Sequence, residues 1–211
     1  LEMIKDGLLT RFPKPDYTLA FHDSAELASG VVGVKAGFAL ANADSVDITV
    51  KGLGGHGAYP HTTKDPIVLA SAIVMRLQTL ISRESNPLEP GVVTVGSFHS
   101  GSKHNIISDE AKLQLTVRSY SDASRKLLLD GIKRIARAEA DASGLPADKM
   151  PEVRIAEPYA RATYNTPALA ERMRGVMTAR FGAARVADPA PSMAGEDFGE
   201  FLVVIGMGLF A

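Results

Sequence analysis

Apolar and polar residues alternate at three places in the middle of the chain. The alternation covers Val46–Lys51, Val92–Phe98 and Ala111–Ser119. A period of two is typical of a strand that buries one face and exposes the other. The sequence therefore predicts three half-buried strands in this region.

Two further segments carry apolar residues at helical spacing. The first opens at Asp65 and Pro66 and continues to about Ser82, and an aspartate followed by a proline is a good N-cap and first helical position. The second follows Ser121, its predicted N-cap. We expect this second helix to present one apolar face, formed by Leu127, Leu128, Ile132, Ile135 and Ala136.

The resulting order is strand, helix, strand, strand, helix, and Val153–Ile155 or a neighbouring segment is a candidate for the final strand. This order fits the split β-α-β arrangement of ferredoxin-like domains. The Ser143–Pro146 stretch has the composition of a domain boundary. We therefore expect an α/β chain whose central part is a ferredoxin-like α+β domain.

The regions on either side of this central part carry weaker patterns. Tyr17–Phe21 and Gly30–Val34 are strand candidates, residues 167–181 are a helix candidate, and Asp197–Leu202 is expected to form a short helix. The first residues look like the last turns of a helix, and Phe201–Ala211 is an apolar, strand-like run. Because native termini are usually polar, we expect the chain to be cut from a longer protein at both ends.

Composition removes several classes of function. A formal net charge of −1 over 211 residues argues against a broad electrostatic surface for nucleic acid or anionic lipid. The absence of cysteine excludes disulfides, thiolate metal sites and cysteine nucleophiles, so any metal must be held by histidine and carboxylate. No apolar run is expected to reach the ~18 residues of a membrane helix, and no signal peptide is expected in this chain. The compartment stays open.

Two of the five histidines lie in a glycine-rich turn, Gly54–His61, directly after the first predicted strand. Glycine adopts positive φ without a steric clash, so such a turn can press backbone amides and imidazole against a ligand. Two roles stay open for His56, a hydrogen-bond donor to a polarised carbonyl as in an oxyanion hole, or a conformational role in a tight turn. His61 is expected to be a separate loop group, because its spacing from His56 gives no shared helix or strand face.

His22 follows the predicted strand that ends at Phe21. Because ligands gather at the carboxyl ends of strands in α/β sheets, a metal-ligand role is open, beside a purely structural hydrogen bond to backbone. Glu196 and Asp197 form an adjacent carboxylate pair that either orients metal ligands or caps the short helix after it.

Two further candidates belong to the last two central strands and their connection. Asn105 lies in the loop between Val92–Phe98 and Ala111–Ser119, and Arg118 lies near the end of Ala111–Ser119. Asn105 and Arg118 offer an amide and a planar guanidinium, which together form a natural clamp for a carboxylate. The alternative is a solvated hairpin and a surface arginine.

Several segments, taken in order, resemble the family of metal-dependent amidohydrolases and peptidases that contains aminoacylases, hippurate hydrolases and carboxypeptidases. The resemblance is greatest to its N-acyl-amino-acid amidohydrolase branch and covers nearly the whole chain. Taken singly, only the glycine–histidine turn is specific to this family. The order of all the matching segments along the chain makes the resemblance strong. The matching segments are Met3–Leu8, Ala20–His22, Gly54–His61, Lys64–Pro66, His104–Ile107, Thr116–Ser119 and Gly195–Phe198.

The resemblance implies a catalytic α/β domain, residues 1–44 and 148–211, interrupted by a ferredoxin-like lid, residues 45–147, that makes a homodimer. It implies that His22 is a ligand of a two-metal centre and that His56 reaches across the dimer to stabilise a tetrahedral intermediate. It also implies that His61, Asn105 and Arg118 contact a substrate with a free carboxylate, an N-acyl amino acid or small peptide. In such enzymes a metal-bridged water attacks the amide carbonyl with help from a glutamate base.

The chain also departs from the family pattern. The histidine–aspartate segment that supplies the first metal ligands is absent, the Glu-Glu pair would fall before Leu1, and the last histidine ligand would fall beyond Ala211. We therefore expect an incomplete centre here, and two divalent ions per subunit in the intact protein, zinc first, with manganese or cobalt as alternatives. The competing hypothesis is a non-catalytic dimerisation or small-molecule-binding module with the same ferredoxin-like fold.

Overall fold

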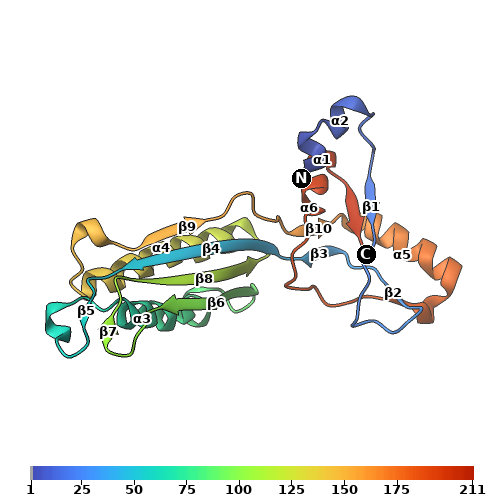
Figure 1. Cartoon of the computed structure of the whole chain (residues 1–211). Helices are drawn as coiled ribbons and strands as arrows, with labels where there is room; N and C mark the ends of the chain where they lie inside the picture. The colour runs from blue at the N-terminus through green and yellow to red at the C-terminus, as the bar shows by residue number, and fades with distance from the viewer. Residues whose placement is uncertain (1) are drawn as a thin grey trace. The chain divides into compact units, whose positions relative to one another are not determined.

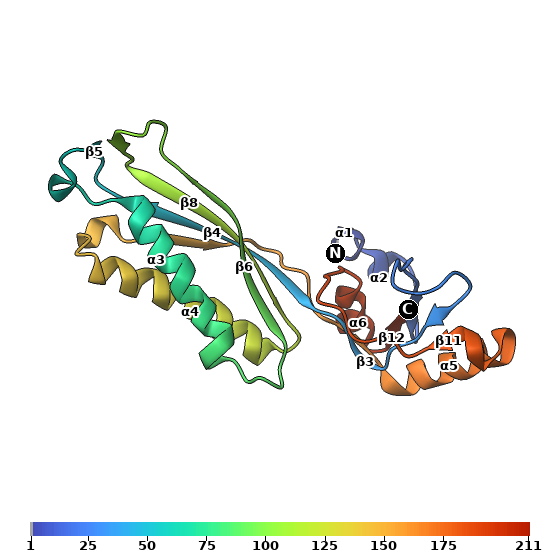
Figure 2. The ribbon, with the colours of Figure 1, turned by 90° about the horizontal axis from the view of Figure 1, so that it is seen from below.

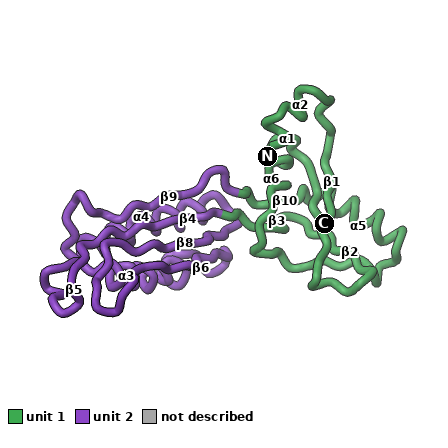
Figure 3. The backbone as a smooth tube through the Cα atoms, viewed as in Figure 1, with its two compact units in different colours: residues 1–43, 160–211 green, residues 44–159 purple. Residues whose placement is uncertain are grey.

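The computed structural model describes residues 2–211 and divides into two compact units (Figure 3). Unit 1 comprises residues 2–43 and 160–211, and unit 2 comprises residues 44–159. The point at which the chain returns to unit 1 differs from the expected residue 147. The reason is β9 (Glu152–Ile155), which pairs with the first strand of unit 2 and so extends that unit.

Unit 2 is built on a four-stranded sheet in the order β6-β8-β4-β9 (Figure 1). Its strands are β4 (Asn42–Lys51), β6 (Gly91–Ser100), β8 (Glu110–Ser119) and β9. The β6–β8 and β4–β9 pairs are antiparallel. Together with a helix after β4 and another after β8, this order is the ferredoxin-like arrangement that the sequence predicts.

Two long helices cover one face of this sheet, as Figure 2 shows. They are α3 (Pro66–Thr79), continued by one π-helical turn η2 (Leu80–Glu84), and α4 (Asp122–Ala142). The Asp65 carboxylate accepts hydrogen bonds from the Ile67 and Val68 amides, and the Ser121 hydroxyl accepts one from the Ser124 amide. Both predicted N-caps are therefore confirmed.

The alternating strands and the helical faces meet in one core. Its fully buried large side chains come from all these elements: Val46, Ile48, Val50, Ile73, Leu77, Leu80, Leu113, Val117, Leu128 and Ile132. The expectation for Leu127 is wrong, because its side chain is 38% exposed while Leu129 is 7% exposed. The buried face of α4 is therefore rotated about the helix axis relative to the face that the sequence predicts.

The α3–η2 segment, Pro66–Glu84, is long and apolar enough to cross a membrane by length and composition alone. The expectation that no segment approaches that length is therefore wrong by this criterion. However, Ile73, Leu77 and Leu80 are fully buried within the core of unit 2. The segment packs as a core helix.

Unit 1 contains three short strand pairs. Strand β1 (Thr18–Ala20) is parallel to β12 (Gly208–Phe210), β2 (Val32–Gly33) is parallel to β11 (Val186–Ala187), and β3 (Gly37–Leu40) is antiparallel to β10 (Thr163–Asn165). Its helices are α1 (Glu2–Lys5), α2 (Leu8–Arg11), α5 (Pro167–Phe181) and α6 (Gly199–Ile205). The remaining short elements of the chain are β5 (Gly55–His56), η1 (Pro60–Thr62), β7 (Ile106–Ile107), η3 (Ala147–Lys149) and η4 (Ala183–Arg185).

The C-terminal part of unit 1 differs from the sequence prediction. Phe201–Ala211 begins inside α6 and becomes a strand only at Gly208. The buried Asn165 amide fixes this strand, since its Nδ2 donates to the Phe210 carbonyl and its Oδ1 accepts from the Phe210 amide, each at 2.8 Å. The strand is therefore specified by a contact distant in sequence.

Candidate functional site

The glycine–histidine turn is held against the loop that carries Asn105. Strand β5 pairs with β7, which places His56 opposite Ile106. The Gly57 amide donates to the Asn105 carbonyl oxygen at 2.8 Å. The structure therefore brings His56 and Asn105 together at the end of the sheet where β8 begins, although they are far apart in the sequence.

The glycines of this turn are needed for a different reason from the one expected. None of Gly54, Gly55 and Gly57 is among the glycines with positive φ. Instead, a Cβ on Gly54 would lie 2.7 Å from the Ile107 carbonyl oxygen, and one on Gly57 would lie 3.1 Å from the Asn105 carbonyl oxygen. The glycines permit close approach of two backbones rather than an unusual dihedral angle.

The turn fixes the state of the His56 ring. The Ala58 amide lies 3.1 Å from His56 Nδ1, and a backbone N–H only donates, so Nδ1 is the acceptor. The proton of the neutral ring is then on Nε2. His56 therefore presents an N–H donor from a hydrogen-bonded turn, which is the chemistry that an oxyanion needs.

Tyr59 links the two histidines of the turn. Its ring centre lies 5.7 Å from that of His56 and 6.3 Å from that of His61, the latter in an edge-on arrangement. His61 lies in η1 and is exposed, as Tyr59 is. The three rings form an exposed cluster on one turn, in which His56 and His61 each contact Tyr59.

Arg118 does not join this cluster within one chain. It lies near the end of β8, whereas Asn105 lies before β7, at the opposite end of that strand. Ten strand residues span about 30 Å. The Arg118 Nε donates to the Thr116 hydroxyl at 2.9 Å, and its half-buried side chain lies on the sheet face away from α3 and α4.

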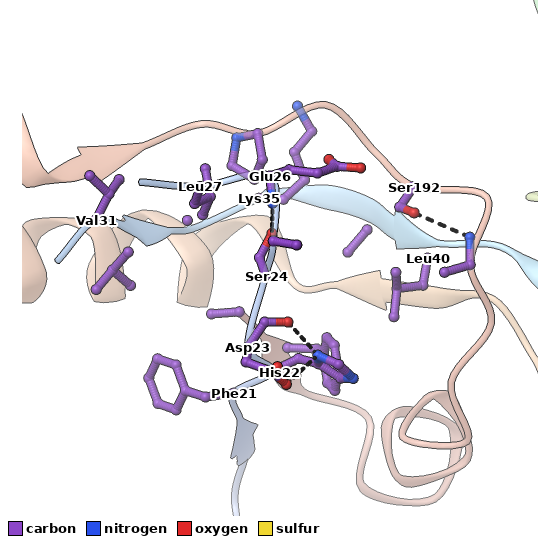
Figure 4. A pocket seen from close by; sticks show the side chains of 18 of the residues that line it. Phe21, His22, Asp23, Ser24, Glu26, Leu27, Val31, Lys35, Leu40 and Ser192 are labelled. Carbon is purple, nitrogen blue, oxygen red and sulfur yellow. Dashed lines mark hydrogen bonds and ion pairs between the residues drawn. The ribbon is translucent and has the colours of Figure 1, made fainter. Parts of the chain in front are cut away.

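His22 lines a cavity of about 570 Å³ in unit 1 (Figure 4). Its Nδ1 lies 2.6 Å from the Asp23 carbonyl oxygen and 3.3 Å from Asp23 Oδ1, so Nδ1 carries the proton. In the neutral ring Nε2 is then deprotonated, which is the form that binds a metal ion. His22 thus has the geometry of a single metal ligand, and its side chain is 58% exposed.

The two adjacent carboxylates differ in their positions. Glu196 lines the same cavity as His22, and its Oε1 accepts from the Asp197 amide at 2.7 Å. A side-chain hydrogen bond with Glu196 lowers the pKa of Asp197. Helix α6 begins at Gly199, with Phe198 in the N-cap position, so neither carboxylate occupies the expected N-cap.

A complete metal centre is not assembled among residues 2–211. Within that range no three His, Asp or Glu side chains lie close enough to hold one ion. A tetrahedral or five-coordinate site needs at least three protein donors. Among the described residues, His22 is therefore a candidate for a single metal ligand.

Three residues contribute contacts that the sequence alone did not identify. Tyr59 bridges the two histidine rings, Asp23 sets the tautomer of His22, and Asp109 binds the Gly54 amide. Tyr59 lies within the glycine–histidine turn and Asp23 directly follows His22, so proximity in sequence indicated both residues. Asp109 lies 55 residues from Gly54, and no local pattern indicates that contact.

Comparison with known proteins identifies the protein family to which this chain belongs. Residues 38–143 match the family described as the peptidase dimerisation domain, M20. The chain therefore belongs to the M20 family of peptidases and amidohydrolases, and unit 2 is its dimerisation domain.

Curated relatives cover nearly the whole chain. N-acetyldiaminopimelate deacetylase of Bacillus subtilis is 34% identical over 201 residues, which is 95% of this chain and 52% of that enzyme. The protein of the same name from Leuconostoc mesenteroides is 35% identical over 188 residues, covering 89% of this chain and 48% of that enzyme. The chain thus spans about half the length of the curated relatives it matches.

Solved structures give the same fold. A putative aminohydrolase from methicillin-resistant Staphylococcus aureus aligns with a TM-score of 0.79 and 29% identity, over 99% of this chain and 52% of that one. A Bacillus subtilis protein described as a dinuclear metal-binding peptidase of the M20 family aligns with a TM-score of 0.74 and 24% identity, over 99% of this chain and 50% of that one. The α/β fold with a dimerisation domain is therefore shown.

Proposed function

We propose that this chain is part of a metal-dependent amidohydrolase that cleaves the amide bond of N-acyl amino acids or small peptides with a free carboxylate. The observation that carries the proposal is the His56 ring, whose Nδ1 accepts from the Ala58 amide and whose Nε2–H is therefore a donor. An N–H donor stabilises the oxyanion that develops when water attacks an amide carbonyl. The names of the curated relatives, deacetylases of an N-acetylated amino acid, support this reaction class.

The separation of Arg118 from Asn105 supports an active site that combines two chains. A small substrate cannot contact both residues of one chain across about 30 Å of strand β8. Two copies related by a two-fold axis can bring the Asn105 end of one chain to a substrate bound by the other. In this arrangement His56, His61 and Asn105 act on the partner's substrate, and Arg118 binds the carboxylate of a substrate in its own subunit.

Strand β6 is the edge of the unit 2 sheet that we propose as the dimer contact. An edge strand presents unpaired backbone groups to a second copy. Ile67 on α3 and Phe98 on β6 are 40% and 39% exposed, and the Ile67 side chain reaches the end of β6 near Gly101. Apolar side chains and an open strand are thus available on the same side of the unit.

Substitution of Ile67 by aspartate is expected to raise the dissociation constant of the dimer at least about tenfold. In an isologous interface the same patch lies on both subunits, so the substitution buries two unpaired charges. A negative charge in the first turn of α3 is favourable for the helix, so the fold is retained. Val176→Asp, at an apolar position of α5 that is 52% exposed, is the matched control. Sedimentation equilibrium measures both, and an unchanged dimer in Ile67→Asp would contradict this interface.

The 211-residue chain is expected to retain less than about 0.2 tightly bound metal ions after dialysis, because a stable site needs at least three donors. The longer protein that contains it is expected to retain two. Elemental analysis of both proteins after dialysis provides the measurement. Two tightly bound zinc or manganese ions per 211-residue chain would show that the centre is complete within it.

The second candidate function is a non-catalytic dimerisation or small-molecule-binding module. Unit 2 by itself supplies the edge strand and the ring cluster that such a module needs. The sequence that precedes this chain in its gene discriminates between the two functions. If that sequence lacks both a histidine–aspartate segment and a Glu-Glu pair, the amidohydrolase proposal fails.

A further inference from the structure

Asp109 binds the segment that leads to His56 at two points. Its carbonyl oxygen accepts from the Gly52 amide at 2.7 Å, and its carboxylate Oδ1 accepts from the Gly54 amide at 2.9 Å. The first bond uses the backbone and is available to any residue. The second depends on the aspartate side chain.

The carboxylate occupies a space that only glycine leaves open. A Cβ on Gly54 would lie 2.9 Å from Asp109 Oδ1 and 2.7 Å from the Ile107 carbonyl oxygen, closer than real Cβ contacts. Gly54 and Asp109 are therefore fitted to each other. Both residues lie outside β4 and β8, in the loops at that end of the sheet.

From this contact a series of hydrogen bonds runs to the His56 ring. Strand β5 follows Gly54 directly, with Gly55 opposite Ile107 and His56 opposite Ile106. Beyond the ring, the Ala58 amide donates to His56 Nδ1. On the Gly54 side of His56, two side chains bond this backbone: the Asp109 carboxylate accepts from the Gly54 amide, and the Lys149 Nζ donates to the Gly52 carbonyl oxygen at 3.2 Å.

We propose that Asp109 is a positioning residue for His56, which holds the turn so that the Nε2–H points in a fixed direction. The inference rests on the proposed function for its catalytic consequence, but not for its structural content. Asp109 does not contact the ring, and its effect passes through the Gly54 amide and strand β5. A donor whose direction is fixed before the reaction stabilises the oxyanion without a reorganisation cost.

The structural content is tested in the 211-residue chain labelled with ¹⁵N-histidine. In the wild type the His56 nitrogens are expected to show a deprotonated Nδ1 and a protonated Nε2 at a pH where the ring is neutral. Asp109→Ala is expected to shift both signals towards a mixture of tautomers and to speed exchange of the Gly54 and Ala58 amide protons at least about tenfold. Asp109→Asn is expected to restore the wild-type state, since an amide oxygen also accepts.

Glu110→Ala is the matched control, because it removes the neighbouring carboxylate, which pairs with Lys112 at 3.0 Å and not with the turn. It is expected to leave the His56 signals unchanged. If Asp109→Ala also leaves the His56 signals and the Ala58 exchange unchanged, or if Asp109→Asn behaves as Asp109→Ala does, the proposal is overturned.

The catalytic consequence is tested in the longer protein. Asp109→Ala is expected to lower kcat about tenfold with KM changed less than about twofold, and Asp109→Asn to retain the wild-type kcat. A normal kcat in Asp109→Ala overturns the catalytic consequence if His56→Ala is impaired. If His56→Ala is itself unimpaired, the proposed function has failed, and the ¹⁵N experiment still decides whether Asp109 positions the turn.

Discussion

Replacement of His56 by alanine is expected to lower kcat of the proposed intact amidohydrolase by roughly 10²–10³, the usual cost of one oxyanion donor. The reason is the tautomer set by the Ala58 amide, which leaves Nε2–H available as a donor to an oxyanion. Because His56 lies in unit 2 and His22 lies in unit 1, the metal content is expected to stay unchanged. Steady-state kinetics and elemental analysis of the same preparation measure both quantities.

The matched control is His104→Ala, which removes an exposed histidine from the adjoining loop. It is expected to keep kcat within about twofold of the wild type, because a surface substitution seldom alters the site. An unimpaired kcat in His56→Ala would reduce His56 to a residue of the turn. A loss of metal in His56→Ala would show that it acts on the centre instead.

Replacement of Arg125 by alanine is expected to destabilise unit 2 by about 3–5 kcal/mol, the cost of removing one partner of a buried ion pair. Asp44 is 1% exposed, and the Arg125 Nε lies 3.0 Å from each of its carboxylate oxygens. Burial lowers the pKa of Arg125, but the hydrogen bond and the charge of Asp44 outweigh burial and raise it above its ordinary value. The guanidinium also lies 3.4 Å from the centre of the Tyr159 ring.

This cluster joins the two ends of unit 2, since Asp44 is its first residue and Tyr159 its last. Truncation of Arg125 leaves the Asp44 carboxylate buried without its counter-charge. Arg134→Ala is the control on the same helix, because Arg134 and Glu84 form an exposed pair, which is worth about 0–1 kcal/mol. Denaturant unfolding compares the two variants, and equal losses of stability would contradict a special role for Arg125.

Much of unit 2 follows from its sequence because its strands alternate cleanly and its helices carry strong N-caps. Asp65 and Ser121 fix where α3 and α4 begin through local hydrogen bonds, and local signals are readable in one sequence. The misassigned Leu127 reflects a rotation of the helix face, which packing against the sheet decides. Such rotations are set by the partner and not by the helix.

Unit 1 is less predictable because its strands are two to four residues long and each pairs with a segment far away in the sequence. Strand β12 depends on the Asn165 amide, and Phe201–Ile205 became helical despite an apolar, strand-like composition. The end of unit 2 at residue 159 also depends on a contact distant in sequence, because only the pairing of β9 with β4 places this segment in unit 2.

The same distinction between local signals and distant contacts applies to the candidate site. The sequence predicts candidate residues for the chemistry, but not how the fold groups them, because the grouping depends on pairing at a distance. His56 and Asn105 meet through the β5–β7 pair, whereas Arg118 lies at the opposite end of β8. The direction of the His56 donor depends on one backbone amide, which no pattern of side chains reports.

The most direct test of the account is the activity of mixed dimers of the intact protein, formed from His56→Ala and His22→Ala subunits. Each parent dimer is expected to be nearly inactive, one for lack of the oxyanion donor and the other for lack of a metal ligand. If His56 acts on the partner's substrate, each heterodimer has one complete site, so a random mixture recovers about one quarter of wild-type activity. A mixture that stays as inactive as its parents would show that His56 acts within its own chain, or not at all, and would contradict the account.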